Sequence, residues 1–189
     1  MRWLLAFVVG AVVCTALDHQ HVVWGVLSYP HPDFWSQAWW VPLLFGCATL
    51  AALITVEPFR RLLGGEPLAQ PPAMPILDVA IFAAAYYFTA VANPQPDLVA
   101  GLLFGVWLLR VAAGLPGWAI AYSIGAAIVG PAFEATWSGI GFFQYHHPDF
   151  IGVARWLPML YLHVGVVAVS IGQKMKMPAA VPIEIEVVV

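Results

Sequence analysis

Six long apolar stretches limit the folds that this chain can adopt. Soluble domains carry roughly 25% charged residues, whereas 9% of these 189 residues are charged and 62% are hydrophobic. A helix of about 20 apolar residues crosses the hydrocarbon core of a bilayer. The stretches therefore predict an all-α, polytopic membrane protein with six transmembrane helices, at about 3–20, 37–57, 75–93, 97–114, 117–138 and 153–173. We expect residues 1–176 to form one membrane domain and residues 177–189 a C-terminal tail.

The cationic side chains are distributed unevenly between the two sides of this six-span arrangement. Only Arg155 falls on one side. The others fall on the opposite side: Arg2, Arg60, Arg61, Arg110, Lys174 and Lys176. Cytoplasmic loops carry the excess of Lys and Arg in membrane proteins, so both termini are expected in the cytoplasm. Seven cations and a net charge of −3 do not form a nucleic-acid surface.

The chain contains an internal repeat, in which residues 18–46 resemble residues 134–162 at an offset of 116. The acid Asp18 meets the acid Glu134. Identical residues stand at Tyr29, His31, Pro32, Asp33, Phe34, Ala38, Trp40, Pro42 and Leu44, and at Tyr145, His147, Pro148, Asp149, Phe150, Ala154, Trp156, Pro158 and Leu160. Each copy consists of an apolar helix, an acid, an aromatic loop and a second apolar helix. Two such units predict two halves that face each other across a shared cavity.

Each copy places a Pro-Asp pair before its second helix and a further proline within that predicted helix. Asp33 and Asp149 can accept hydrogen bonds from free backbone N–H groups at a helix start, and we interpret them as structural caps. Pro42 and Pro158 fall about one turn inside their predicted spans. There a proline would free a carbonyl and kink the helix. Such a kink either opens a gap between helices or serves packing alone.

Three acids lie in or near the spans, namely Asp18, Glu134 and Asp78. A carboxylate is costly in lipid, so each should face the interior or a polar partner, although Asp18 and Glu134 could also lie at the membrane surface. Six histidines are present, but their spacing matches no metal-binding motif, so we predict neither a metal nor another cofactor. No serine is placed by a motif beside a base, and the sequence predicts no enzyme.

Gly101 and Gly105 form a GxxxG pattern in the fourth span. Small residues at this spacing allow two helices to approach closely. We expect the pattern to serve packing within the molecule, with contact between copies as the alternative.

Three segments resemble the Insig (insulin-induced gene) proteins. They are Ala38-Trp39-Trp40-Val41-Pro42, Leu63-Gly64-Gly65-Glu66-Pro67 and Gln144-Tyr145-x-x-Pro148-Asp149-Phe150-x4-Arg155-Trp156-Leu157-Pro158. The resemblance covers nearly the whole chain and implies six spans with cytosolic termini. Because the longer polar N-terminal extension of eukaryotic members is missing, the chain resembles a compact prokaryotic homologue.

The resemblance also implies a regulatory, sterol-binding protein without catalytic activity. Eukaryotic members lie in the endoplasmic reticulum, bind oxysterols and hold the Scap protein and HMG-CoA reductase. Their aspartate after the fourth span is absent from Val106-Trp107-Leu108-Leu109-Arg110. Regulation of the Scap type is therefore not implied for this chain.

The sequence thus predicts a non-catalytic membrane protein that holds a sterol or a two-chain neutral lipid, such as diacylglycerol, in a cavity among its helices. The candidate ligand contacts are Gln95, Asp78, Trp40, Pro42, Trp107 and Trp156. Expected partners are membrane lipid, a membrane protein and further copies of the chain, with no nucleic acid. The expected location is the plasma membrane of a prokaryote or the endoplasmic reticulum of a eukaryote. Two alternatives stay open: an intramembrane enzyme acting on a lipid or isoprenoid through Asp18, Glu134 and the histidines, and a small transporter.

Overall fold

The computed structural model describes residues 1–175, and these residues form an all-α bundle, which confirms the predicted class. Its helices are α1 (Arg2–Val23), α2 (Val41–Leu62), α3 (Met74–Val91), α4 (Pro96–Ala112), α5 (Gly117–Gly139) and α6 (Leu157–Gly172), followed by the short 3-10 helix η1 (Gln173–Met175). Two short strands, β1 (Leu27–Ser28) and β2 (Gln144–Tyr145), lie in the loops after α1 and α5. The tail predicted at 177–189 lies outside the described residues.

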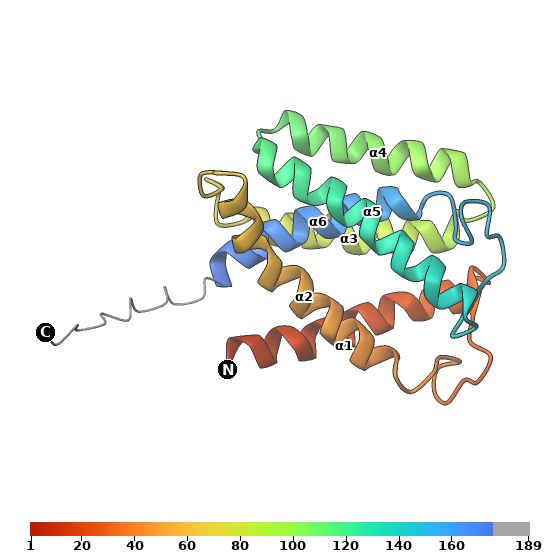
Figure 1. Ribbon diagram of the computed structural model, residues 1–189. Helices are drawn as coiled ribbons and strands as arrows, with labels where there is room; N and C mark the ends of the chain where they lie inside the picture. Colours follow the sequence, from red (N-terminus) through yellow and green to blue (C-terminus); the bar gives the residue numbers. More distant parts are fainter. Residues whose placement is uncertain (176–189) are drawn as a thin grey trace, which may run out of the picture.

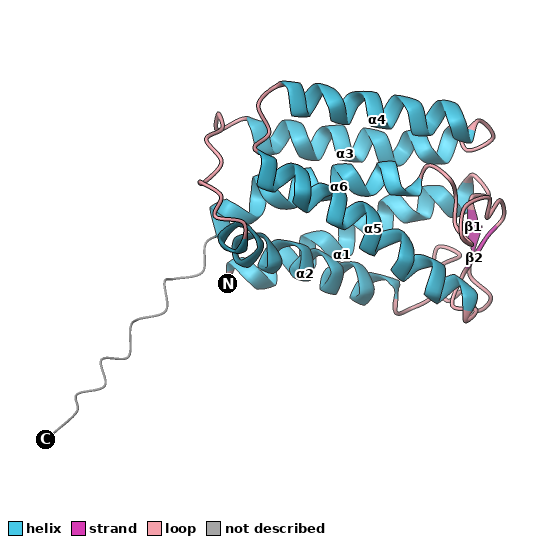
Figure 2. Ribbon diagram, turned by 45° about the horizontal axis from the view of Figure 1, so that its top comes forward, coloured by secondary structure: helices cyan, strands magenta, loops and turns pink. Residues whose placement is uncertain are grey.

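The bundle has two distinct ends (Figure 1). The N-terminus, loop 63–73, loop 113–116 and the end of α6 form what we call the terminal end. Loops 24–40, 92–95 and 140–156 form the loop end, where the two strands meet (Figure 2). Arg110 and Lys174 contact residues near the start of α3, at the terminal end, whereas Arg155 lies at the loop end.

The lengths of the helices decide how far the six-span prediction is supported. The helices α1, α2, α3 and α5 are long and apolar enough to cross a membrane, whereas α4 has 17 residues and α6 has 16. At about 1.5 Å of rise per residue, a helix of 17 residues is about 26 Å long. The chain is a membrane protein, and the crossing of α4 and α6 stays a prediction.

Helix α6 lies at the centre of the bundle, because α2, α3, α4 and α5 all pack against it. Its sequence is apolar on every side, which is typical of a helix that is buried all round. Of its 16 residues, 10 are buried. Helix α1 packs mainly on α2, and α5 packs mainly on α6.

The register of the two strands relates the copies of the repeat. Strands β1 and β2 are antiparallel, with Leu27 opposite Tyr145 and Ser28 opposite Gln144. Ser28 and Gln144 are 116 residues apart, which is the offset of the repeat, so a position pairs with its own counterpart. This arrangement corresponds to an approximate two-fold axis between Ser28 and Gln144.

The predicted kinks at Pro42 and Pro158 are wrong. Both prolines lie at the second position of their helices, α2 and α6, which begin at Val41 and Leu157. A proline at a helix start removes no intrahelical hydrogen bond, because its missing N–H would have no partner there. The prolines inside helices are Pro58 in α2 and Pro131 in α5.

The expected role of Gly101 and Gly105 in internal packing is also wrong. A Cβ atom added at either glycine of α4 would meet nothing within 4 Å among the described residues. The tightly packed glycines lie elsewhere: a Cβ at Gly165 of α6 would overlap the backbone of Ser123 in α5. The GxxxG face of α4 therefore points away from its neighbours.

Candidate functional site

Two carboxylates occupy equivalent positions in the two copies of the repeat. Asp18 is buried near the end of α1, and Glu134 is partly buried near the end of α5. Tyr29 donates a hydrogen bond of 2.7 Å to Asp18 Oδ2, and Tyr145 donates one of 2.5 Å to Glu134 Oε2. Each tyrosine follows its acid by 11 residues. The repeat thus encodes two copies of one acid–tyrosine unit.

The groups around the two acids differ. Asp18 also accepts hydrogen bonds from Gln37 Nε2 at 2.7 Å and from the Tyr86 hydroxyl at 3.5 Å. Glu134 instead accepts a bond of 2.6 Å from Tyr161 in α6. Neutral donors therefore surround both carboxylates.

Burial and the neighbouring carboxylates keep the loop tyrosines protonated. Burial is the main factor that raises the pKa of Tyr29, and the charge of Asp18 raises it further. Burial and Glu134 raise the pKa of Tyr145 in the same way. Both phenols therefore remain hydrogen-bond donors at ordinary pH.

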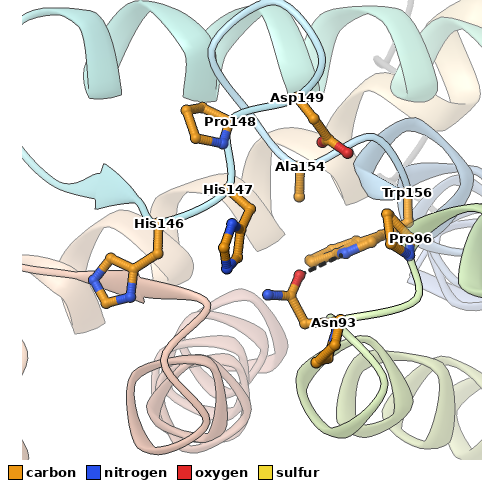
Figure 3. A pocket seen from close by; sticks show the side chains of 9 residues that line it. Asn93, Pro96, His146, His147, Pro148, Asp149, Ala154 and Trp156 are labelled. Atoms are coloured by element: carbon orange, nitrogen blue, oxygen red, sulfur yellow. Dashed lines mark hydrogen bonds between the residues drawn. The ribbon is translucent and has the colours of Figure 1, made fainter.

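Two cavities open at the loop end, and equivalent positions line them. The first, which we call the Asn93 cavity, has a volume of about 510 Å³; its lining residues are Asn93, Pro94, Pro96, His146, His147, Pro148, Asp149, Ala154 and Trp156 (Figure 3). The second, the Trp39 cavity, has about 380 Å³; its lining residues are Pro30, His31, Asp33, Ala38, Trp39, Trp40, Ile140, Gly141 and Phe142. Five positions correspond at the offset of 116, for example His31 with His147 and Trp40 with Trp156.

Asn93 is the most deeply buried polar residue that lines its cavity. Its side chain is 7% exposed, and its Oδ1 accepts a hydrogen bond of 3.1 Å from Trp156 Nε1. Figure 3 shows the amide nitrogen turned toward His147, on the other side of the cavity. This nitrogen has no hydrogen-bond partner among the described residues, so it can donate to a molecule in the cavity.

The predicted ligand contacts do not form one group. Trp156 lines the Asn93 cavity and Trp40 lines the Trp39 cavity. Gln95 is exposed at the start of α4 and lines neither cavity, and Pro42 lines neither. Trp107 is buried elsewhere and donates to Ser123 Oγ at 3.2 Å.

Asp78 lies at the opposite end of the molecule from both cavities. It forms a salt bridge of 2.9 Å with Arg110 and accepts a hydrogen bond from Ser170, so it joins α3 to α4 and α6. Arg110 is thus held by an acid of the neighbouring helix. A buried pair of this kind is costly to break, because removing one partner leaves the other charge uncompensated.

Asp33 and Asp149 organise equivalent loops. Asp33 accepts a hydrogen bond of 3.0 Å from the backbone N–H of Trp39, and Asp149 accepts one of 2.8 Å from that of Arg155. Each donor lies directly before the N-cap of the next helix, which is Trp40 or Trp156. The prediction that the two aspartates cap these helices is therefore wrong, because each binds a backbone N–H of the loop before the helix. Arg155 also pairs with Asp97 at 2.7 Å, and this contact raises its pKa.

Most histidines bind neighbouring segments. His21 bonds to Thr89 Oγ1 at 2.9 Å, His19 to the Trp35 carbonyl at 2.9 Å, and His146 to the Gly25 carbonyl at 2.8 Å. No group of three or more His, Cys, Asp or Glu residues in the described part of the chain could hold a metal ion. The absence of a bound metal stays a prediction.

Sequence reasoning missed three contributors to these sites. Tyr29 and Tyr145 could have been found, because both copies place a tyrosine at the same distance from an acid. Asn93 lies outside the repeat in an Asn-Pro turn, and its burial depends on Trp156 from a distant segment. Nothing in its sequence context distinguishes it from the neighbouring Gln95.

Comparison with known proteins identifies the relatives of this chain. No family model matches it. It is 33% identical over 186 residues to an INSIG protein homolog of Mycolicibacterium vanbaalenii, with 90% of this chain and 84% of the relative covered. It is 29% identical over 189 residues to the insulin-induced gene 1 protein of Danio rerio, with 93% and 72% covered.

Solved structures agree with the sequence comparison. The crystal structure of MvINS, a mycobacterial Insig homolog from Mycobacterium vanbaalenii, superimposes with a TM-score of 0.79 at 29% identity, covering 94% of this chain and 96% of that one. A cross-linked trimer of MvINS gives a TM-score of 0.78 with the same identity and coverage. Because it is 33% identical to the INSIG protein homolog of Mycolicibacterium vanbaalenii over 90% of this chain and 84% of that relative, the chain belongs to the Insig family.

Proposed function

We propose that this chain is a non-catalytic membrane protein that binds a sterol or a two-chain neutral lipid, such as diacylglycerol, among its helices. The observation that carries the proposal is the Asn93 amide. It is 7% exposed, and its unpartnered nitrogen faces a cavity of about 510 Å³. A donor that faces a cavity and has no protein partner is free to bind a ligand, and a polar head group would supply an acceptor oxygen.

The lining of the Asn93 cavity favours a neutral head group. Ligand cavities of about 300–1,000 Å³ combine an apolar lining with a few polar groups, and this cavity combines Pro96, Ala154 and Trp156 with Asn93 and Asp149. Asn93 can donate to a hydroxyl or carbonyl oxygen, and the Asp149 carboxylate can accept from a hydroxyl. The head group then lies at the loop end, with the apolar part of the lipid along the helices.

We further infer six spans with both termini in the cytoplasm. Arg110 and Lys174 lie at the terminal end, and the excess of cations marks the cytoplasmic side. The loop end with its two cavities then faces away from the cytoplasm. A homo-oligomer is part of this proposal, since the related MvINS was crystallised as a cross-linked trimer.

Lipid binding can be tested in two steps. Mass spectrometry of the purified protein should detect a co-purified sterol or diacylglycerol. Competition with diacylglycerol, its deoxy analogue, in which hydrogen replaces the hydroxyl group, and an oxysterol then measures the polar contact. Because one hydrogen bond contributes about 1 kcal/mol, we expect the free hydroxyl to bind about fivefold more tightly than the deoxy analogue.

The variant Asn93→Leu should abolish this preference, whereas Gln95→Leu, two residues away on the surface, should keep it. Because Asn93 also bonds to Trp156, the melting temperature of each variant is measured alongside. If no lipid of the series binds saturably to the wild-type protein, the proposed function is rejected. Equal binding of the alcohol and the deoxy analogue would reject only the role of Asn93.

A further inference from the structure

Two buried polar atoms near Asp18 have no hydrogen-bond partner in the described structure. They are Thr15 Oγ1, in a residue that is 3% exposed, and Gln37 Oε1, in a residue that is fully buried. Buried polar atoms in folded proteins are almost always hydrogen-bonded, and an exception usually indicates an unseen water or ion. The third such atom, Gln173 Nε2, lies at the terminal end, far along the bundle.

Both atoms belong to the cluster around the Asp18 carboxylate. Gln37 Nε2 donates to the Thr15 carbonyl at 3.2 Å and to Asp18 Oδ2 at 2.7 Å. Thr15 and Asp18 are three residues apart on α1, so their side chains lie on one face of the helix. Gln37 thus links Thr15 to Asp18, and both unpaired oxygens belong to this group of three residues.

The second copy of the repeat offers an internal comparison. At the offset of 116, Thr15 corresponds to Pro131 and Gln37 to Val153, so neither polar group recurs. Phe45 in turn corresponds to Tyr161, whose hydroxyl donates to Glu134 at 2.6 Å. The first copy thus lacks one hydroxyl group that the second copy has, and carries two unpaired oxygens that the second copy lacks.

We propose that one water molecule is bound between Thr15 and Gln37 and supplies the hydroxyl that Phe45 lacks. The water donates one hydrogen to Gln37 Oε1 and accepts a hydrogen bond from the Thr15 hydroxyl. Its second hydrogen is directed to Asp18 Oδ1, which otherwise has only the long contact of 3.5 Å with Tyr86. Three partners are typical of a buried structural water.

A water fits this site better than a metal cation does. Gln37 Nε2 lies 2.7 Å from Asp18 Oδ2, and the Tyr29 hydroxyl donates to the same oxygen. These N–H and O–H groups already occupy Oδ2, one of the oxygens that a cation would need as a ligand. A water can lie beside them, because it both donates and accepts.

Crystals of the full chain, at a resolution that shows ordered solvent, test the proposal directly. We expect one density peak within hydrogen-bond distance of both Thr15 Oγ1 and Gln37 Oε1, retained in Thr15→Ser and lost in Thr15→Val. No peak in the wild type would overturn the proposal. A peak that continues into a lipid chain would also overturn it.

The melting temperature in detergent provides a second test, because a water-bound and an unpaired Thr15 hydroxyl predict shifts of opposite sign in Thr15→Val. If the water is present, Thr15→Val removes one of its partners and should lower the melting temperature by roughly 2–4 °C. If the Thr15 hydroxyl is truly unpaired, the same change removes a buried unsatisfied group and should raise the melting temperature.

A sodium ion in place of the water is tested by measuring the melting temperature of the wild type with sodium replaced by choline at constant ionic strength. We expect an unchanged melting temperature. A lower value would show a sodium ion in place of the water.

Discussion

Neutral donors rather than cations stabilise Asp18 and Glu134, the two carboxylates that the repeat relates. Among the described residues, Asp18 and Glu134 form no salt bridge, and their closest donors are the hydroxyls of Tyr29, Tyr145 and Tyr161. A carboxylate inside a membrane protein requires such partners, because lipid supplies none. Hydrogen bonds to an ionised acceptor are also stronger than those between neutral groups.

Removing these donors should destabilise the bundle. Tyr29→Phe and Tyr145→Phe each leave a carboxylate oxygen with one donor fewer, and each should lower the stability by about 1–3 kcal/mol. Thermal unfolding in detergent measures the effect. Tyr87→Phe is the matched control, since Tyr87 is 49% exposed and its hydroxyl forms no hydrogen bond in the described structure. Melting of both loop variants at the temperature of the control would contradict the structural role of the acid–tyrosine units.

The sequence predicted single residues unevenly. It identified Asp18 and Glu134 as equivalent, because the repeat aligns them. It selected Gln95 rather than Asn93 as a ligand contact, and only the packing of Trp156 against the turn distinguishes the two. It did not identify Gln37, whose partner Asp18 is 19 residues away along the chain. Burial of a loop side chain depends on distant segments, which hydropathy and spacing do not describe.

Helices were predicted in the right number and order, and their starts were less accurate. The predicted second and sixth spans begin at 37 and 153, whereas α2 and α6 begin at Val41 and Leu157. The residues before each helix are apolar enough to extend the hydropathy window. Their backbone instead turns back on itself, with Phe34 bridged to Gln37 and Phe150 to Val153. This difference in the helix starts placed Pro42 and Pro158 wrongly inside their helices.

Helix packing gives a prediction for the glycines. Gly165→Ala should destabilise the protein by about 1–3 kcal/mol, the usual cost of overpacking, because its Cβ would overlap the backbone of Ser123. Gly101→Ala in α4 meets nothing within 4 Å. It should instead stabilise the helix by up to about 1 kcal/mol. Thermal unfolding of the purified protein in detergent would compare the two, and a loss of stability in Gly101→Ala would indicate that α4 packs against another copy.

The whole molecule should expose its two ends on opposite sides of the membrane. With Cys14 and Cys47 replaced by Ala, single cysteines are introduced by Glu66→Cys at the terminal end and by His31→Cys at the loop end, where both positions are exposed. Six spans with cytoplasmic termini predict that an impermeant maleimide labels the His31→Cys variant in intact cells and the Glu66→Cys variant only after lysis. Labelling of both from the outside would contradict the six-span arrangement.

The pairing of Ser28 with Gln144 has a consequence for how the whole molecule is assembled. A register that joins a position to its own counterpart is the one that two identical chains adopt in an isologous dimer. The units α1–β1–α2 and α5–β2–α6 therefore meet as two subunits would, although one chain carries both. The hairpin α3–α4 occurs once and packs on α6. It also packs on α1, so it meets the first helix of one unit and the second helix of the other, and the two units can carry different residues at matched positions.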